Sequence, residues 1–221
     1  MVEIFATEDG SHSLLSEKFG VTYHSKHGAV QESQHVFIEA GLHPKSVDSK
    51  ELSILEIGMG SGLNVFMTYL EAKKMGLTVD LTTYEIFPIS VKQAKELNYA
   101  SVLNAEKEAF IFEKIHACEW ERSIDLSSFF TIKKQQKNFL EIEDMAKYDV
   151  IYFDAFAPNA QPELWEAALL QKMYNALKTG GVMTTYCAKG VVKRTLKSVG
   201  FEIEAILGPP GKREMTRAWK R

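Results

Sequence analysis

The sequence has little cysteine, no long hydrophobic run and no strong net charge. Cys118 and Cys187 lie far apart and lack the spacing of metal ligands or of a disulfide framework. No segment approaches the roughly 20 apolar residues of a membrane helix. The N-terminus carries Glu3, Glu8 and Asp9 and has no apolar stretch that would suit a signal peptide. These absences predict a cytoplasmic protein without a disulfide framework or a membrane anchor.

Charge is distributed unevenly along the chain. The formal net charge of −3 does not by itself indicate nucleic-acid binding. Residues 189–221, however, contain nine Lys or Arg and three Glu, and a solvated surface is the plainest interpretation of such a segment. His24, His27 and His35 also cluster, but no H-x-x-x-H pair or cysteine accompanies them. We therefore expect hydrogen-bonding histidines and no metal site.

Three alternating glycines, Gly58, Gly60 and Gly62, form the most informative stretch. Residues 51–57 predict a buried strand, and apolar residues at helical spacing follow the glycines, which therefore lie in a strand-to-helix turn. Such a turn needs positive φ angles or a close backbone approach. With Glu56 two residues before the first glycine, the pattern is typical of the turn that holds the methionine end of S-adenosylmethionine (SAM) in methyltransferases. The dinucleotide fingerprint puts its third glycine where this chain has Leu63, which disfavours an NAD-dependent oxidoreductase.

Two further carboxylates follow predicted strands. Residues 77–84 predict a second strand, and Glu85 comes directly after it. An acid at this place in an α/β nucleotide-binding fold accepts hydrogen bonds from ribose hydroxyls. Residues 148–153 predict another buried strand, which leads into Asp154 and a stiff loop that contains Phe156 and Pro158. Since the carboxyl end of a central strand opens onto the ligand crevice of a doubly wound sheet, we expect Asp154 at a binding site.

Asp154 would suit the methylation of an amine. Methyl transfer is an in-line displacement, so catalysis depends largely on positioning the nucleophile. A primary alkylamine has a pKa of about 10, as lysine does, and arrives mostly protonated. A carboxylate can hold the ammonium and accept its proton. The alternative role for Asp154 is to cap a helix or to fix its own loop.

The order of predicted elements indicates the fold. Strands and helices alternate along residues 51–207, which predicts an α/β fold with right-handed crossovers. A closing strand pair, 201–207 and 214–219, matches a methyltransferase sheet whose last strand is antiparallel, and we expect that strand at the edge. We predict a Rossmann-like, class I SAM-dependent methyltransferase with a mostly parallel seven-stranded sheet over residues 51–221. Residues 1–50 would be an extension packed on this core, a candidate lid, with a short helix over 31–40 closed by Gly41.

Several segments, in the same order, resemble one methyltransferase family. They are the stretch from Gly58 to Asn64, the stretch from Asp154 to Asn159 with Pro162-Glu163-Leu164-Trp165, the segment Lys212-Arg213-Glu214-Met215, and residues 23–37. They are similar to the methyltransferase domain of the tRNA wobble-uridine modification enzyme MnmC and to its stand-alone form, MnmD. MnmC fuses this domain to a flavin-dependent oxidase. We expect SAM as the cofactor and no flavin, because the chain ends where the oxidase would begin.

The resemblance implies a reaction and a partner. The reaction is N-methylation of the 5-aminomethyl group of wobble (2-thio)uridine in tRNA, giving 5-methylaminomethyl-(2-thio)uridine, with Asp154 as the essential carboxylate. The partner is the anticodon region of tRNA, with functional coupling to the enzyme that makes the aminomethyl intermediate. Basic residues would then contact phosphates, and aromatic residues would stack on a splayed base. The candidate phosphate contacts are Lys189, Lys193, Arg194, Lys197, Lys212, Arg213 and Arg217.

The implied site residues fall into two sets. The cofactor set is Glu56, Gly58, Gly60, Gly62, Asn64, Glu85 and Gln135, and the substrate set is Tyr23, Glu32, Phe156, Pro158, Trp165, Lys189, Lys212 and Arg213. Gln135 is a departure, because the family carries a Gly-Asp pair where this chain has Lys134-Gln135. A glutamine carbonyl can accept a hydrogen bond from the adenine amino group, but it brings no charge.

Two other functions stay open on the residues alone. The first is transfer of a methyl or aminopropyl group to a small alkylamine, as in spermidine synthase, which also places an aspartate after a similar strand. A basic C-terminal segment would repel such cationic substrates. The second is a non-catalytic Rossmann-like binding module that has kept its glycine turn. The joint presence of the glycines, Glu85 and Asp154 favours an enzyme.

Overall fold

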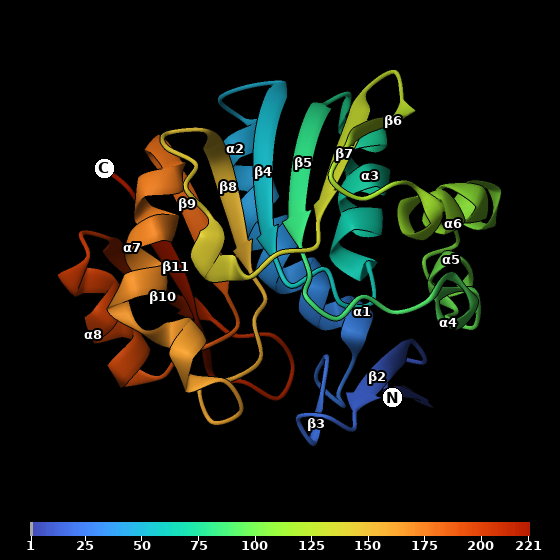
Figure 1. Cartoon of the computed structure of the whole chain (residues 1–221), viewed down its shortest axis with the longest axis horizontal. Helices are drawn as coiled ribbons and strands as arrows, with labels where there is room; N and C mark the ends of the chain where they lie inside the picture. Colours follow the sequence, from blue (N-terminus) through green and yellow to red (C-terminus); the bar gives the residue numbers. More distant parts are fainter. Residues whose placement is uncertain (1) are drawn as a thin grey trace.

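An eight-stranded sheet forms the centre of the molecule in a computed structural model that describes residues 2–221 (Figure 1). Its strands in chain order are β4 (Glu51–Ile57), β5 (Thr78–Tyr84), β6 (Ser123–Ser127), β7 (Phe130–Gln135), β8 (Tyr148–Phe153), β9 (Leu177–Thr185), β10 (Glu202–Leu207) and β11 (Glu214–Trp219). Their order across the sheet is β10-β11-β9-β8-β4-β5-β7-β6. The five strands from β9 to β7 are parallel, and β11 is antiparallel to both of its neighbours. This is the predicted methyltransferase sheet, extended at one edge by β6, which pairs antiparallel with β7.

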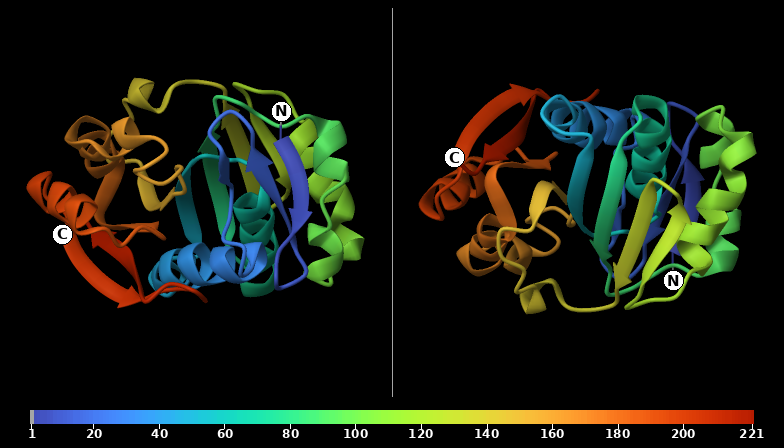
Figure 2. Two further views of the ribbon diagram at one scale, coloured as in Figure 1. Left: turned by 90° about the horizontal axis from the view of Figure 1, so that it is seen from below. Right: turned by 90° about the horizontal axis from the view of Figure 1, so that it is seen from above.

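The helices cover both faces of this sheet (Figure 2). In chain order they are α1 (Ala29–Ser33), the π-helical segment η1 (Gln34–Leu42), α2 (His43–Ser46), α3 (Leu63–Met75), α4 (Val91–Lys95), α5 (Tyr99–Val102), η2 (Glu106–Glu108), α6 (Ala109–Ala117), η3 (Phe139–Glu141), η4 (Pro162–Trp165), α7 (Ala167–Ala176) and α8 (Gly190–Ser198). None of those described is long and apolar enough to cross a membrane.

Alternation along the central strands separates two apolar cores. In β8, Val150 and Tyr152 belong to the core shared with η1 and α3, whereas Ile151 and Phe153 belong to the core beneath α7 and α8. All four side chains are fully buried. Successive residues of a strand point to opposite faces, so a nearly continuous apolar run is what a sheet covered on both faces requires.

Residues before β4 form a small sheet and a helical segment. The sheet contains β1 (Val2–Ala6), β2 (His12–Ser16) and β3 (Val21–Thr22), all antiparallel. It lies beyond one end of the central sheet, close to the turn that leads into α3 (Figure 1). The backbone N–H of His12 donates to Oδ1 of Asn98 at 2.8 Å, which ties the small sheet to the α4–α5 connection.

The helix expected over residues 31–40 is longer than predicted, and Gly41 does not end it. Helical backbone continues from α1 through η1 to Ser46. A Cβ at Gly41 would lie 3.2 Å from Thr184 Oγ1 and 3.2 Å from the ring of Tyr152, so this glycine lets the helix pack close to the sheet. By contrast Gly76 ends α3 in the left-handed conformation, as a C-terminal glycine is expected to do.

The expectation that 214–219 forms the edge strand is wrong. The chain turns back after β10, and β11 inserts between β10 and β9, so that β10 lies at the edge. Gly180 and Gly181 also lie inside β9, which begins at Leu177, where the register with β8 shifts. A short strand seen in isolation does not show which neighbours it pairs with, because strand order is set by tertiary contacts.

Candidate active site

The glycine turn between β4 and α3 brings two distant segments together. Gly58 has φ +88° and Gly60 has φ +53°, conformations that favour glycine. A Cβ at Gly58 would lie 2.9 Å from the carbonyl oxygen of Asp154, and a Cβ at Gly60 would lie 2.9 Å from Cδ1 of Tyr23. The turn therefore packs directly against both the Asp154 loop and the N-terminal segment.

Glu85 fastens this turn to the end of β5. Gly60 donates its backbone N–H to Oε2 of Glu85 at 3.0 Å, and Phe87 donates to Oε1 at 2.8 Å. Burial raises the pKa of the Glu85 carboxyl above its ordinary value. Glu85 stands where the sequence predicted it, at the carboxyl end of the strand beside β4.

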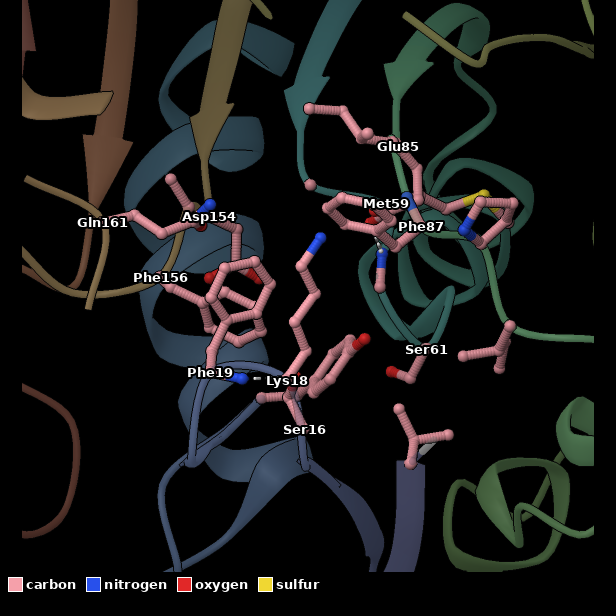
Figure 3. A pocket seen from close by; sticks show the side chains of 18 of the residues that line it. Ser16, Lys18, Phe19, Met59, Ser61, Glu85, Phe87, Asp154, Phe156 and Gln161 are labelled. Carbon is pink, nitrogen blue, oxygen red and sulfur yellow. Dashed lines mark hydrogen bonds between the residues drawn. The ribbon is translucent and has the colours of Figure 1, made fainter. Parts of the chain in front are cut away.

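A cavity of about 290 Å³ opens at this end of the sheet. Its walls come from five places: the N-terminal sheet, the glycine turn, the segment after β5, Phe139 of η3 and the loop after β8 (Figure 3). Of the predicted residues, Tyr23, Gly58, Gly60, Glu85, Asp154 and Phe156 line it. The ring of Tyr23 stands edge-on to the ring of Phe156, with centroids 5.1 Å apart. The carboxyl ends of parallel strands are where a doubly wound sheet binds its ligand.

Asp154 follows β8 and its carboxyl group faces this cavity (Figure 3). Asn64, in the first turn of α3, donates from Nδ2 to Oδ2 of Asp154 at 2.9 Å. Burial, and then the negative charge of Glu32, raise the pKa of Asp154 to about 7, while the bond from Asn64 and the charge of Lys212 lower it. A carboxyl group that changes protonation near neutral pH can both hold a cation and accept a proton.

Glu56 lies underneath the site, away from the cavity. Its side chain is fully buried, and Thr83 donates to its Oε2 at 2.6 Å. Burial raises the pKa of Glu56 to about 8, although the bond from Thr83 lowers it. Glu56 Oε1 and Asn64 Oδ1 are buried without a partner among residues 2–221.

Two hydrogen bonds hold the loop that follows Asp154. Tyr186 donates from its hydroxyl to the carbonyl of Ala155 at 2.8 Å, and Trp165 donates from Nε1 to the carbonyl of Phe156 at 2.8 Å. Trp165 is only 5% exposed and packs against Phe153, so in this arrangement it fixes the loop. Its stacking on a base stays a prediction.

Glu32 and Lys212 form an ion pair beside the site. Lys212 Nζ lies 2.5 Å from Oε1 of Glu32, and 4.0 Å from the ring centroid of Tyr186. The backbone N–H of Ser25 donates to the other Glu32 oxygen at 2.7 Å. The pair joins α1 to the turn after β10. Both charges act on the pKa of Asp154, which places the pair at the edge of the candidate site.

The other predicted residues lie outside the cavity. Pro158, Trp165 and Lys189 line a neighbouring groove between the Asp154 loop and α8. Lys189 donates from Nζ to Oδ1 of Asn159 at 2.6 Å. The amide of Gln135 satisfies its neighbours when its nitrogen donates to Glu121 and its oxygen accepts from Lys133 at 2.9 Å, so this side chain is turned away from the cavity.

The basic C-terminal residues divide into two groups. Lys193 pairs with Glu214, and Arg217 makes a two-point contact with Glu204, so these charges, like that of Lys212, are already matched. The others expected at phosphates are exposed and have no carboxylate partner among residues 2–221; they are Lys189, Arg194, Lys197 and Arg213. About half of the basic residues predicted to contact phosphates therefore form ion pairs within the fold.

The tip of the N-terminal hairpin carries cavity residues that were not predicted from the sequence. Lys18 and Phe19 lie between β2 and β3 and line the cavity (Figure 3). The ring of Phe19 lies 5.2 Å from that of Phe156 and 6.1 Å from that of Phe87, measured between centroids. The only local signal was the turn residue Gly20. Contacts between segments more than a hundred residues apart leave no periodicity to read.

The groups that line this cavity suit SAM. A nucleoside carrying an amino acid needs a carboxylate at its ribose and close backbone approach at its other end, and Glu85 and the glycine turn meet these needs. No Cβ could be accommodated at Gly58 or Gly60 without displacing a neighbour.

Comparison with known proteins agrees with this geometry. Residues 105–221 match the profile of a family described as S-adenosyl-L-methionine-dependent methyltransferase. The chain belongs to this family. The methyltransferase cofactor is accordingly SAM, and the fold is that of a Rossmann-like class I enzyme.

Curated relatives and solved structures extend the match. The tRNA 5-methylaminomethyl-2-thiouridine biosynthesis bifunctional protein MnmC of Delftia acidovorans is 30% identical over 215 residues, covering 92% of this methyltransferase and 33% of the relative. The protein of the same name from Leptospira borgpetersenii is 29% identical over 211 residues, covering 91% and 32%. This chain thus spans about a third of the relatives' length.

Two solved structures share the fold. MnmC2 from Aquifex aeolicus has a TM-score of 0.80 at 24% identity, covering 100% of this chain and 70% of its own. Spermidine synthase from Thermotoga maritima has a TM-score of 0.54 at 17% identity, covering 98% and 67%. At these identities the likeness concerns the fold.

Proposed function

We propose that this methyltransferase transfers a methyl group from SAM to the amino nitrogen of 5-aminomethyl-(2-thio)uridine at the tRNA wobble position. The product would be 5-methylaminomethyl-(2-thio)uridine. The names of the relatives support this, since they concern biosynthesis of 5-methylaminomethyl-2-thiouridine in tRNA. The matching region is about a third of those bifunctional proteins, so the proposal concerns the methyl-transfer step alone.

The observation that carries the proposal is Asp154 in the cavity. Its side chain is half-buried and lies beside the glycine turn, and desolvation raises the pKa of its carboxyl to about 7. An alkylammonium that enters this site would be held by the carboxylate and would lose a proton to it, which frees the nitrogen lone pair. A hydroxyl or carbon nucleophile would gain less from a fixed negative charge than a cationic amine does.

We assign the cofactor contacts in the same way. SAM, when bound, supplies an electrophilic methyl group on a sulfonium sulfur. Glu85 would accept bonds from the ribose hydroxyls, and Gly58 and Gly60 would let the backbone approach the amino-acid end. Asn64 would keep Asp154 oriented. Glu56 would support the turn from below through its hydrogen bond with Thr83, since it does not line the cavity.

We propose that tRNA binds across α8 and the turn after β10. Lys189 lines the groove beside the Asp154 loop, Arg194 and Lys197 are exposed on α8, and Arg213 is exposed in the turn after β10. Exposed cations of this kind suit phosphates. Tyr23 and Phe156, whose rings line the cavity, would contact the target base. Residues 1–50 would cover the site, because Phe19 packs against Phe87 and Phe156 from the opposite wall.

The test offers labelled SAM with two acceptors in competition: tRNA that carries 5-aminomethyl-uridine, and a polyamine such as spermidine. The proposal expects label in the tRNA, on the wobble nucleoside. Label in the polyamine would instead favour a small-molecule amine transferase, and label in neither would favour a binding module.

A further inference from the structure

The cavity contains a single positive charge to match its acids. Among the described residues that line it, the acidic side chains are Glu85 and Asp154, and Lys18 is the one Lys or Arg. His24 also lines the cavity, but burial lowers its pKa to about 4, so it is neutral near pH 7. Lys18 thus provides the cationic side chain available there to an anionic group of a ligand.

Lys18 is poised over the cavity without an anion of its own. Its ammonium lies 3.4 Å from the ring centroid of Phe87 and 5.4 Å from that of Phe19. Figure 3 shows the side chain extending from the hairpin into the space between Asp154 and Met59. No carboxylate of residues 2–221 pairs with it. A cation on aromatic faces at an exposed site is held by only about 0.5–1 kcal/mol, so a carboxylate can redirect it.

The glycine turn offers few N–H groups for an anion. Gly58 and Met59 donate to the carbonyl of Tyr84 at 3.0 and 3.2 Å, and Gly62 donates to the carbonyl of Met59 at 2.8 Å. The N–H of Gly60 is already taken by Glu85. These bonds leave few donors in the turn for a carboxylate at this end of the cavity, and Lys18 of the hairpin reaches into the same space.

We propose that Lys18 binds the α-carboxylate of SAM and makes the enzyme specific for the carboxylated donor. Decarboxylated SAM, the donor of aminopropyl groups, lacks this anion and would gain nothing from Lys18. The residue would thus separate methyl transfer from aminopropyl transfer on a shared fold. The inference rests on SAM as cofactor and is independent of which amine accepts the methyl group.

Calorimetric titration of the full chain tests this. Lys18→Met should weaken binding of SAM and of S-adenosylhomocysteine about tenfold or more, the loss expected for one charged hydrogen bond. Binding of 5′-methylthioadenosine, which lacks the whole amino-acid part, should stay within roughly twofold and shows that the variant is folded. The wild type should prefer SAM to decarboxylated SAM, and Lys18→Met should abolish that preference. Lys26→Met, an equal charge change on the same segment outside the cavity lining, should bind like the wild type.

Two outcomes would overturn the proposal. One is unchanged SAM affinity in Lys18→Met, particularly if tRNA affinity falls, which would assign Lys18 to a phosphate. The other is an equal loss for SAM and 5′-methylthioadenosine, which would make Lys18 a support for Phe87 and not a carboxylate partner. Either result leaves the proposed methylation of tRNA untouched.

Discussion

Asn64 donates a hydrogen bond from Nδ2 to Oδ2 of Asp154 across 2.9 Å, which joins the first turn of α3 to the end of β8. The glycine turn leads directly into that helix, so the segment that shapes the cofactor cavity also orients the carboxylate. The bond favours the ionised form of Asp154 and partly offsets the effect of burial on its pKa. In the proposed mechanism, cofactor binding and proton acceptance would therefore be coupled through the side-chain amide of Asn64.

Asn64→Ala should move the pH dependence of methyl transfer to higher pH. Asp154 must be ionised to hold the ammonium, so activity rises with pH through its pKa of about 7. Loss of the donor raises that pKa further, and the rate at pH 6.5 should fall by about two- to tenfold while the rate at pH 9 is nearly restored. The measurement is kcat/KM as a function of pH. Thr68→Val, which removes a buried hydroxyl one turn further along α3, should leave the profile in place.

Gly58→Ala should impair both stability and SAM binding. The new Cβ would lie 2.9 Å from the Asp154 carbonyl at a φ of +88°, which combines backbone strain with displacement of the loop that contains Asp154. We expect a loss of about 1–3 kcal/mol in the free energy of unfolding and a large loss of SAM affinity. Gly76→Ala is the matched control: its φ is +65°, but nothing lies within 4 Å of the Cβ. Equal loss of SAM affinity in both variants would contradict this account of the turn.

Glu56→Gln should make the protein more stable at alkaline pH. The pKa of Glu56 is about 8 in the folded protein, against an ordinary value of 4.5, so folding favours the protonated form. The resulting stability is present at acidic pH and is lost as the pH rises through about 8. The variant should therefore gain at least about 1 kcal/mol over the wild type at pH 8.5 and gain less at pH 6, in urea unfolding. A variant that loses stability equally at both pH values would show that the carboxyl is not buried with a raised pKa.

Arg194→Gln with Lys197→Gln should weaken tRNA binding and reduce its salt dependence. Both side chains are exposed on α8 without carboxylate partners among residues 2–221. For every phosphate that the variant no longer neutralises, the slope of log affinity against log salt should fall by roughly 0.7–0.9. The control is the same charge change at Lys92 and Lys107, which are exposed on the α4–α6 side, opposite α8 in Figure 1. Unchanged binding in the α8 variant would remove this helix from the tRNA footprint.

The sequence predicted the parts of the site that local chemistry determines. Three glycines, a strand followed by Glu85 and a strand followed by Asp154 were readable because turns and strand ends impose their own residue types. Lys18 and Phe19 were not, since only the folded hairpin brings them over the cavity. Lys212 was predicted as a phosphate contact, and its pairing with Glu32 was not foreseen, because the two residues are 180 positions apart. The mostly parallel type of sheet was likewise predictable from the sequence. The order of its edge strands was not, because β11 inserts between β10 and β9.

The most direct test is nucleoside mass spectrometry of tRNA bearing 5-aminomethyl-uridine after incubation with SAM, for the wild type and for Asp154→Asn. The wild type should add 14 daltons, about the mass of one CH₂, to that nucleoside. The variant should lose about 10²- to 10⁴-fold in rate while still binding SAM, because a neutral amide can neither hold the ammonium nor accept its proton. No mass gain with the wild type, or full activity in Asp154→Asn, would contradict the central claim.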